Sequence, residues 1–232
     1  MAAMALVGAL GLTSCDNETN DTQMITGYCT VEGSNPNYTF LMDGGGTVEP
    51  TPSSITEITG GKGMPTQRAL VYIEYEKSDF IEVAGSNDWI IKNGEMKGGA
   101  GIEIGTLLSK SQAEQKNLLA ADSIFKINKL NNCWAWNGYL NVSINGYYSY
   151  QNSRTVRPSF EVMVAETAEN LMKLKVLYNR HSSKDAAIGG DVDQMKSYNI
   201  RQWLMGVPGK DSVTIEINVE DGVSKKLKTS RH

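Results

Sequence analysis

Histidine is nearly absent from this chain, since only His181 and His232 occur among 232 residues. Zinc sites built from several imidazoles are therefore excluded. The sequence also lacks HExxH, GxSxG and Walker-type phosphate loops, and no pair of carboxylates stands out as the two acids of a glycosidase. We therefore expect no catalytic residue, no metal and no cofactor, and we predict that the protein is not an enzyme.

Two weaker chemical alternatives remain open. Asp185, Asp191 and Asp193 carry the oxygen ligands that hard metals prefer, but they lack the spacing of a calcium loop and are typical of a solvated turn. His181 could form a dyad with Cys29 or Cys133. Both cysteines lie in apolar strand-like runs, so two buried thiols are the favoured interpretation, with a disulfide in an oxidising envelope as the alternative.

Basic residues are missing from the first quarter of the chain. The first one is Lys62, and residues 1–61 contain seven acids, so the net charge of −4 is unevenly placed. Residues 62–232 carry a net charge of +3 without a concentrated basic patch. This distribution argues against a nucleic-acid partner.

Long apolar runs are also missing. A membrane-spanning helix needs about 20 apolar residues, whereas the longest run, Met1 to Leu12, has a dozen. That length is typical of the apolar core of a secretory signal. The run ends in Leu12-Thr13-Ser14-Cys15, which resembles the lipobox of bacterial lipoproteins. By that resemblance residues 1–14 are a signal peptide, and Cys15 is lipidated through its thiol and new amino group. No basic residue precedes Cys15, so we expect the natural start to lie upstream.

Residues 15–23 form an acidic tether after the predicted cleavage site. Several acyl chains on one cysteine would hold the protein stably in a membrane, whereas a single chain binds only marginally. Acidic residues at this position resemble the signal that sends lipoproteins of Bacteroides-type bacteria to the cell surface. We therefore expect an outer-membrane lipoprotein, with a periplasm-facing orientation as the alternative.

The rest of the chain is predicted to be all-β. Short strand-like runs with glycine turns fill residues 24–108, and good helix formers make residues 109–121 a short helical linker. Residues 122–222 form a second β domain, in which Asn145-Gly146 is the better of two hairpin signals and Tyr198 to Leu204 is predicted as a strand. Residues 223–232 are a basic tail. Each half is large enough to bury a core of its own.

The order of four short motifs is similar to that of the NigD-like lipoproteins of Bacteroides-type bacteria. The motifs are Cys15 with its lipobox, Gln67 to Tyr72, Trp136 to Val142, and Leu177 to His181. The resemblance spans nearly the whole mature chain and implies an OB-like barrel followed by an antiparallel β-sandwich. It implies no activity, because the family has none established. One departure is the Ser-Ser-Lys after His181, where an Asn/Gly-rich turn is expected.

Aromatic residues are the remaining signal for a ligand. Exposed rings could stack on sugars, and OB-folds do bind oligosaccharides. The candidate stacking residues are Trp134, Trp136, Tyr139 and Tyr148, although packing within the sandwich core is the favoured interpretation. Ser123 and Ser212 lie in Asp-Ser-aliphatic tripeptides that resemble the O-glycosylation acceptor of Bacteroides-type envelope proteins. Asp-Ser is also common where a turn enters a strand.

These observations lead to one functional prediction with two alternatives. The protein is predicted to be a non-enzymatic envelope protein, joined to the membrane by its lipid, that binds a glycan, a peptide or a partner protein. The first alternative is a structural or assembly component without a small ligand. The second is a hydrolase, which would require His181 to lie in a cleft beside a nucleophile or an acid.

Overall fold

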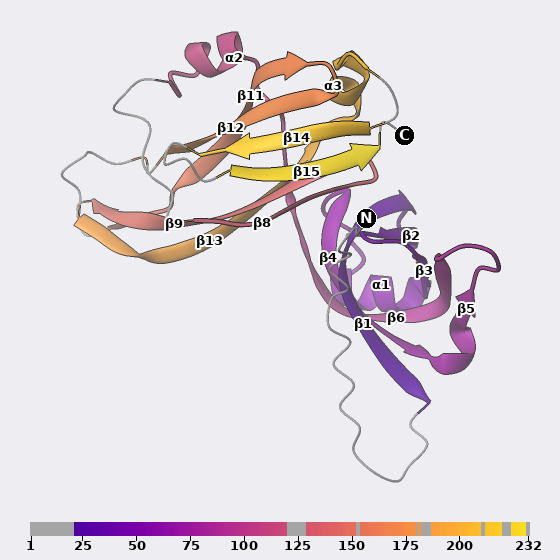
Figure 1. Ribbon diagram of the computed structural model, residues 1–232. Coiled ribbons are helices and arrows are strands. Elements are labelled where there is room, and N and C mark those ends of the chain that lie inside the picture. Colours follow the sequence, from indigo (N-terminus) through magenta and orange to yellow (C-terminus); the bar gives the residue numbers. More distant parts are fainter. Residues whose placement is uncertain are drawn as a thin grey trace. The chain divides into compact units, whose positions relative to one another are not determined.

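The computed structural model describes residues 21–119, 129–151, 154–179, 181, 187–209, 212–219 and 224–230 (Figure 1). Most of them lie in strands, which confirms the predicted all-β class. The chain divides into two compact units, residues 1–102 and 103–232. Among the described residues no helix is long and apolar enough to cross a membrane.

The first unit is a closed five-stranded barrel. Its strands follow the order β3-β2-β1-β4-β6, and parallel pairing of β3 with β6 closes the ring. One helix, α1, lies between β3 and β4 in sequence, as in an OB-fold. The predicted OB-like barrel is confirmed. Its elements are β1 (Thr22–Ser34), β2 (Asn37–Met42), β3 (Thr47–Pro50), α1 (Pro52–Thr59), β4 (Arg68–Glu76), the 3₁₀ turn η1 (Lys77–Asp79), the edge strand β5 (Phe80–Glu82) and β6 (Trp89–Gly101).

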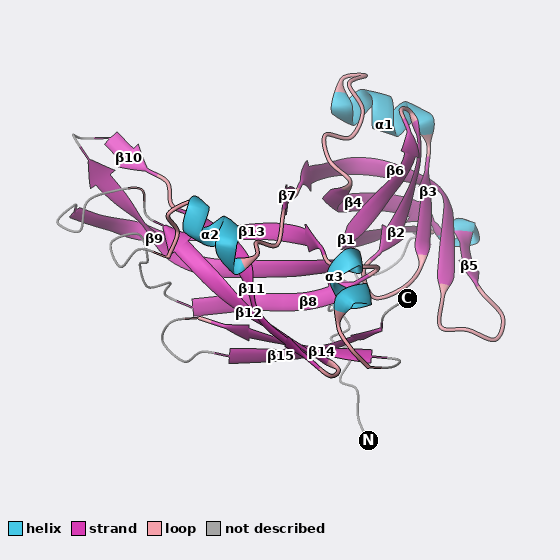
Figure 2. Cartoon of the chain, turned by 90° about the horizontal axis from the view of Figure 1, so that it is seen from above, coloured by secondary structure: helices cyan, strands magenta, loops and turns pink. Residues whose placement is uncertain are grey.

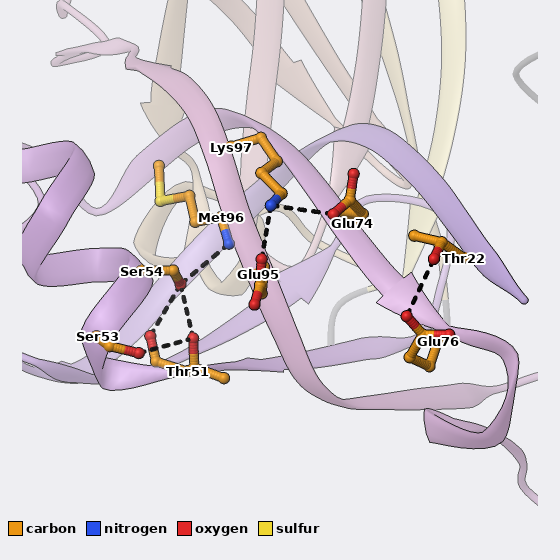
Figure 3. Close-up of polar contacts among 9 residues, drawn as sticks. All are labelled: Thr22, Thr51, Ser53, Ser54, Glu74, Glu76, Glu95, Met96 and Lys97. Carbon is orange, nitrogen blue, oxygen red and sulfur yellow. Dashed lines mark hydrogen bonds and ion pairs between the residues drawn. The ribbon is translucent and has the colours of Figure 1, made fainter.

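Helix α1 was missed, because residues 24–108 were expected to hold strand-like runs with glycine turns, and Pro50 and Pro52 are unfavourable inside a helix. Pro52 instead begins the helix, where proline's missing N–H costs nothing. The helix buries Ile55 in the barrel core. Ser54 accepts a hydrogen bond from the backbone N–H of Met96 at 3.0 Å, which fastens the helix to β6 (Figure 3).

A buried ion pair joins three strands of the barrel. Arg68 is fully buried at the start of β4, and its guanidinium contacts both carboxylate oxygens of Asp43, which follows β2. One of its nitrogens also donates to the hydroxyl of Thr30 on β1, at 2.9 Å. Two parallel bonds suit the planar geometry of arginine and a carboxylate. Arg68 belongs to one of the four family motifs, and this contact gives that motif a structural role.

Removing one partner of this pair is expected to destabilise the barrel strongly. Asp43→Ala leaves the Arg68 charge buried without its carboxylate, which typically costs roughly 3–5 kcal/mol. The free energy of unfolding from chemical denaturation measures the loss. Glu57→Ala on the exposed face of α1 is the control, with a change within about 0.5 kcal/mol. Equal effects of the two substitutions would contradict this role of the pair.

The second unit packs two sheets around a large apolar core. One sheet follows the order β10-β9-β13-β7 with β8 beside β9, and the other follows β11-β12-β14-β15. Figure 1 shows the two sheets as separate layers. The first sheet contains β7 (Glu103–Gly105), β8 (Lys129–Trp136), β9 (Tyr139–Gln151), β10 (Arg154–Val156) and β13 (Ala187–Asn199). The second contains β11 (Ser159–Ala168), β12 (Leu171–Asn179), β14 (Ser212–Asn218) and β15 (Ser224–Ser230).

The segment expected to link the two halves contributes a helix to the second unit. Helix α2 (Lys110–Gln115) begins with a capping box in which Ser109 and Gln112 bond each other's backbone N–H. Its residue Ala113 packs in a small cluster with Met163 of β11 and Leu177 of β12. The division between the units falls after Ile102, ahead of the expected boundary near residue 109.

Two local predictions in the second half are wrong. Asn145-Gly146 is no turn, because both residues lie within β9. Gly146 is needed there for space, since a Cβ would come within 2.4 Å of the Tyr178 hydroxyl oxygen. The turn between β8 and β9 is the other pair, Asn137-Gly138. The strand predicted for Tyr198 to Leu204 ends at Asn199 and is followed by helix α3 (Arg201–Gly206).

Candidate functional site

Two tyrosines near the end of β9 form an exposed pair. Tyr148 and Tyr150 are two residues apart, so their side chains lie on the same face of the strand. Their rings meet edge to face, with 5.4 Å between centroids, and their hydroxyl oxygens are 3.3 Å apart. Tyr150 is 44 % exposed. The pair therefore presents apolar ring surface and two adjacent hydroxyls to solvent.

The neighbouring strand supports this pair with glycines. A Cβ on Gly189 of β13 would lie only 2.1 Å from the Tyr148 ring, so the ring rests against bare backbone. The register of β13 against β9 shifts between Ile188 and Asp191, which is typical of a bulge that redirects a strand. Ile188 is the register partner of Ser149, so its exposed side chain lies on the opposite face of the sheet from the two tyrosines. This arrangement fixes the position of Tyr148 before any ligand arrives.

The contact between the two hydroxyls shifts their pKa values in opposite directions. Hydrogen bonds from the Tyr150 hydroxyl and from the Gly190 backbone lower the pKa of Tyr148. The pKa of Tyr150 is raised, because its proton is shared with Tyr148 and a charged Tyr148 would repel a second phenolate. The two hydroxyls thus share one hydrogen bond, in which either oxygen can be the donor.

We expect Tyr150→Phe to raise the pKa of Tyr148, because it removes the donor that stabilises the phenolate. Tyr148→Phe is the reciprocal variant, and it should lower the pKa of Tyr150 by removing the shared bond. NMR titration of ring-labelled tyrosines measures both values. If both pKa values stayed unchanged in the variants, the hydroxyls would not be bonded in solution.

The other three predicted stacking residues lie elsewhere. Trp134 and Trp136 share the outward face of β8, and Trp136 is opposite Tyr139 in register. Tyr139 is buried, Trp134 is half-buried, and Trp136 is exposed. Nine residues of β9 separate Tyr139 from Tyr148, about 30 Å along a strand. The structure therefore does not gather the four predicted aromatics into one surface.

Comparison with solved structures identifies the fold. A candidate lipoprotein of Bacteroides fragilis matches with a TM-score of 0.56 and 13 % identity, covering 90 % of this chain and 98 % of that one. A NigD-like immunity protein of Bacteroides caccae matches with a TM-score of 0.50 and 12 % identity, covering 88 % and 91 %. This chain has the NigD-like fold. No family model and no curated protein matches the sequence.

The NigD-like resemblance inferred from the sequence is thus confirmed for the fold, and its motifs have structural explanations. The second motif supplies the buried Arg68. In the third, the turn at Gly138 is held by Arg201, whose guanidinium donates to the Asn137 carbonyl at 3.1 Å. In the fourth, the Tyr178 hydroxyl donates to the Tyr147 carbonyl at 2.7 Å. These contacts stabilise the NigD-like fold, and none of them points to a reaction.

His181 contacts a serine of the second unit. Its Nε2 lies 2.6 Å from the hydroxyl of Ser159 on β11, and both side chains are on the surface. The backbone N–H of His181 donates to the Asn179 side chain at 2.7 Å, a local turn bond that suits the positive φ of His181. The expected alternative partners, Cys29 and Cys133, are both buried. The observed contact is typical of an ordered surface turn.

The acidic candidates are bonded to amides. The Asn145 side chain donates to Asp191 at 3.2 Å and to Asp193 at 2.7 Å, and Asn131 also donates to Asp193. Within the described ranges, no group of three histidine, cysteine, aspartate or glutamate side chains could hold a metal. Asp185 lies outside these ranges. The two described aspartates therefore cross-link β8, β9 and β13.

The two described cysteines are free and buried, as the favoured interpretation predicted. Burial raises the pKa of Cys29 to about 12 and that of Cys133 to about 11. Because the thiolate is the reactive form, both thiols are inert at neutral pH. They act as small apolar core residues.

Alkylation at pH 8 tests this conclusion. Both thiols should resist iodoacetamide in the native protein and react once the chain is unfolded in denaturant, as peptide mass spectrometry can follow. An Ile58→Cys variant supplies an exposed thiol as the positive control. Rapid native alkylation of Cys29 or Cys133 would show that the thiol is accessible.

Of the predicted modification sites, only Ser212 is described. It is the first residue of β14, half-buried, and its register partner on β15 is Ser230. Cys15 and Ser123 lie outside the described residues. Their predicted modifications therefore remain predictions.

Sequence reasoning missed a stack of three rings in the barrel unit. Phe80 lies between Tyr75 and Trp89, with centroids 6.2 Å and 5.8 Å away and small interplanar angles. Tyr75 and Trp89 also pack against the barrel core. No local pattern could have found this stack, because the rings come from β4, β5 and β6. Only the strand pairing brings them together.

Proposed function

We propose that this protein is a lipid-anchored binding protein of the outer bacterial surface that recognises a glycan and catalyses no reaction. The observation that carries the proposal is the exposed and pre-positioned pair of Tyr148 and Tyr150. Tyrosine combines a rigid apolar ring with a hydroxyl, so it can contact both the faces and the hydroxyls of a sugar. Gly189 fixes the ring in advance, which lowers the entropic cost of binding.

The envelope location is supported by two independent features. The lipobox resemblance at Cys15 gives an anchor, and the acidic tether after it resembles a surface-sorting signal. One protein of the same fold is described as a candidate lipoprotein. An outward orientation would place the tyrosine pair where environmental or capsular glycans occur.

The non-enzymatic character is supported by the state of the reactive groups. The described thiols are buried, with pKa values well above neutral. Asp191 and Asp193 accept hydrogen bonds from amides, and His181 lies in a surface turn. The exposed aromatic side chains therefore support binding of a ligand better than they support catalysis.

A glycan-binding assay tests the proposal. The purified chain is titrated with polysaccharides isolated from the host envelope and its surroundings, and saturable binding is expected. Tyr150→Ala should weaken binding about 30-fold, because a central aromatic contact contributes about 2 kcal/mol. Met205→Ala removes a still more exposed apolar side chain from α3 and should leave the affinity unchanged.

The assembly alternative has a distinct outcome. A photo-reactive amino acid at position 150 would crosslink to glycan if the proposal is right. If the wild type bound no polysaccharide, and the same probe captured one envelope protein stoichiometrically, the glycan proposal would be overturned. The tyrosine pair would then be part of a protein interface.

A further inference from the structure

Strand β5 and the residue that follows it form an exposed apolar strip, called here the apolar strip of β5, made of Phe80, Ile81 and Val83. All three residues of β5 are exposed, and the strand lies at the edge of its sheet, paired only with β6 among the described strands. Successive side chains of a strand point to opposite sides, so apolar groups emerge from both faces of this ribbon. The stack on Tyr75 and Trp89 holds Phe80 in place.

The apolar strip lies beside the point where the tether enters the barrel. The backbone N–H of Lys77 donates to the Asp21 carbonyl at 2.8 Å, three residues before Phe80. Thr22, the first residue of β1, pairs with Glu76, the last residue of β4. The Thr22 hydroxyl also donates to the Glu76 carboxylate at 3.0 Å (Figure 3). The start of the barrel and the apolar strip therefore share one end of the unit.

The length of the tether limits how far this end can lie from a membrane. Six residues lead from Cys15 to Asp21, and an extended chain spans at most about 3.6 Å per residue. The acylated cysteine and Asp21 are thus at most about 20 Å apart. A lipid on Cys15 would keep the apolar strip within reach of the headgroups.

We infer that the apolar strip of β5 inserts into the lipid surface that holds the Cys15 anchor, and so fixes the barrel on the membrane. This inference rests on the lipid anchor of the proposed function. Lys77, Asp79 and Glu82 flank the strip, so the segment carries no excess of positive charge. Insertion then depends on burial of apolar groups, and salt should not reverse it.

A matched pair of labelled variants tests the insertion. Ile81 in the strip and Ile58 on α1 are both 42 % exposed. They lie at opposite ends of the barrel (Figure 2). Strands β3 and β6 run parallel to each other, α1 comes after the end of β3, and β5 comes before the start of β6. Ile81→Cys and Ile58→Cys each provide one accessible thiol for a polarity-sensitive fluorophore, since Cys29 and Cys133 are buried.

The acylated full-length variants are reconstituted into vesicles of phosphatidylethanolamine and phosphatidylglycerol that contain nitroxide-labelled lipids. We expect several-fold stronger quenching, and a blue-shifted emission, for the label at position 81 than for that at position 58, and both effects should persist in high salt. Equal quenching of the two labels would overturn the insertion. A blue shift that needs no lipid and grows with protein concentration would show a second copy on the strip, and would also overturn it.

Detergent phase partition of the same samples separates the two possible failures. If the chain enters the detergent phase but the two labels are quenched equally, the lipid anchor is present and the inferred insertion is wrong. A chain that stays in the aqueous phase has no anchor, which overturns the anchored part of the proposed function together with this inference. Neither result bears on glycan binding, which is measured separately on the purified chain without vesicles.

Discussion

The buried bond between Arg68 and Asp43 is the contact on which the barrel unit depends. Arg68 begins β4, Asp43 follows β2, and Thr30 on β1 shares the guanidinium, so one side chain ties three strands at a single point. Loss of one partner of a buried ion pair is strongly destabilising, and Thr30 and Arg68 are also register partners in the pairing of β1 with β4. The same register places Thr22 against Glu76. The ion pair and the start of the barrel thus lie at opposite ends of one strand pairing.

In the sandwich unit, two glycines provide the space that tyrosine rings of neighbouring strands occupy. Glycine usually weakens a strand, because it offers no side chain to pack. Here Gly146 makes room for Tyr178, and Gly189 makes room for Tyr148. Tyr178 is buried and serves the core, whereas Tyr148 remains half-exposed beside Tyr150. One packing device therefore serves stability at one position and an accessible surface at the other.

The sequence predicted elements whose signal is local. The helical character of residues 109–121 and the all-β class follow from propensity and from the pattern of short strand-like runs. It failed where tertiary contacts override the local signal. Asn145-Gly146 has the composition of a turn, but the demand of Tyr178 for space explains its glycine. Pro52 suggested a break, yet it begins a helix that fills the barrel with Ile55.

The candidate site was predictable only in part, for the same reason. Tyr148 was identified because it is aromatic. The supporting Gly189 comes from β13, about 40 residues later, and only the pairing of the two strands brings it to Tyr148. The position of the apolar strip of β5 next to Asp21 could not be predicted either, because the sequence does not show that these two segments are close in space.

The central claim is that an anchored protein presents its binding surface outside the cell. Protease shaving of intact host cells, followed by a blot for this protein, tests it most directly, with a periplasmic protein and a Cys15→Ala variant as controls. The account predicts that the wild type is cut while the periplasmic protein stays intact. Protection of both proteins until the outer membrane is opened would contradict the outward orientation and favour a role in envelope assembly.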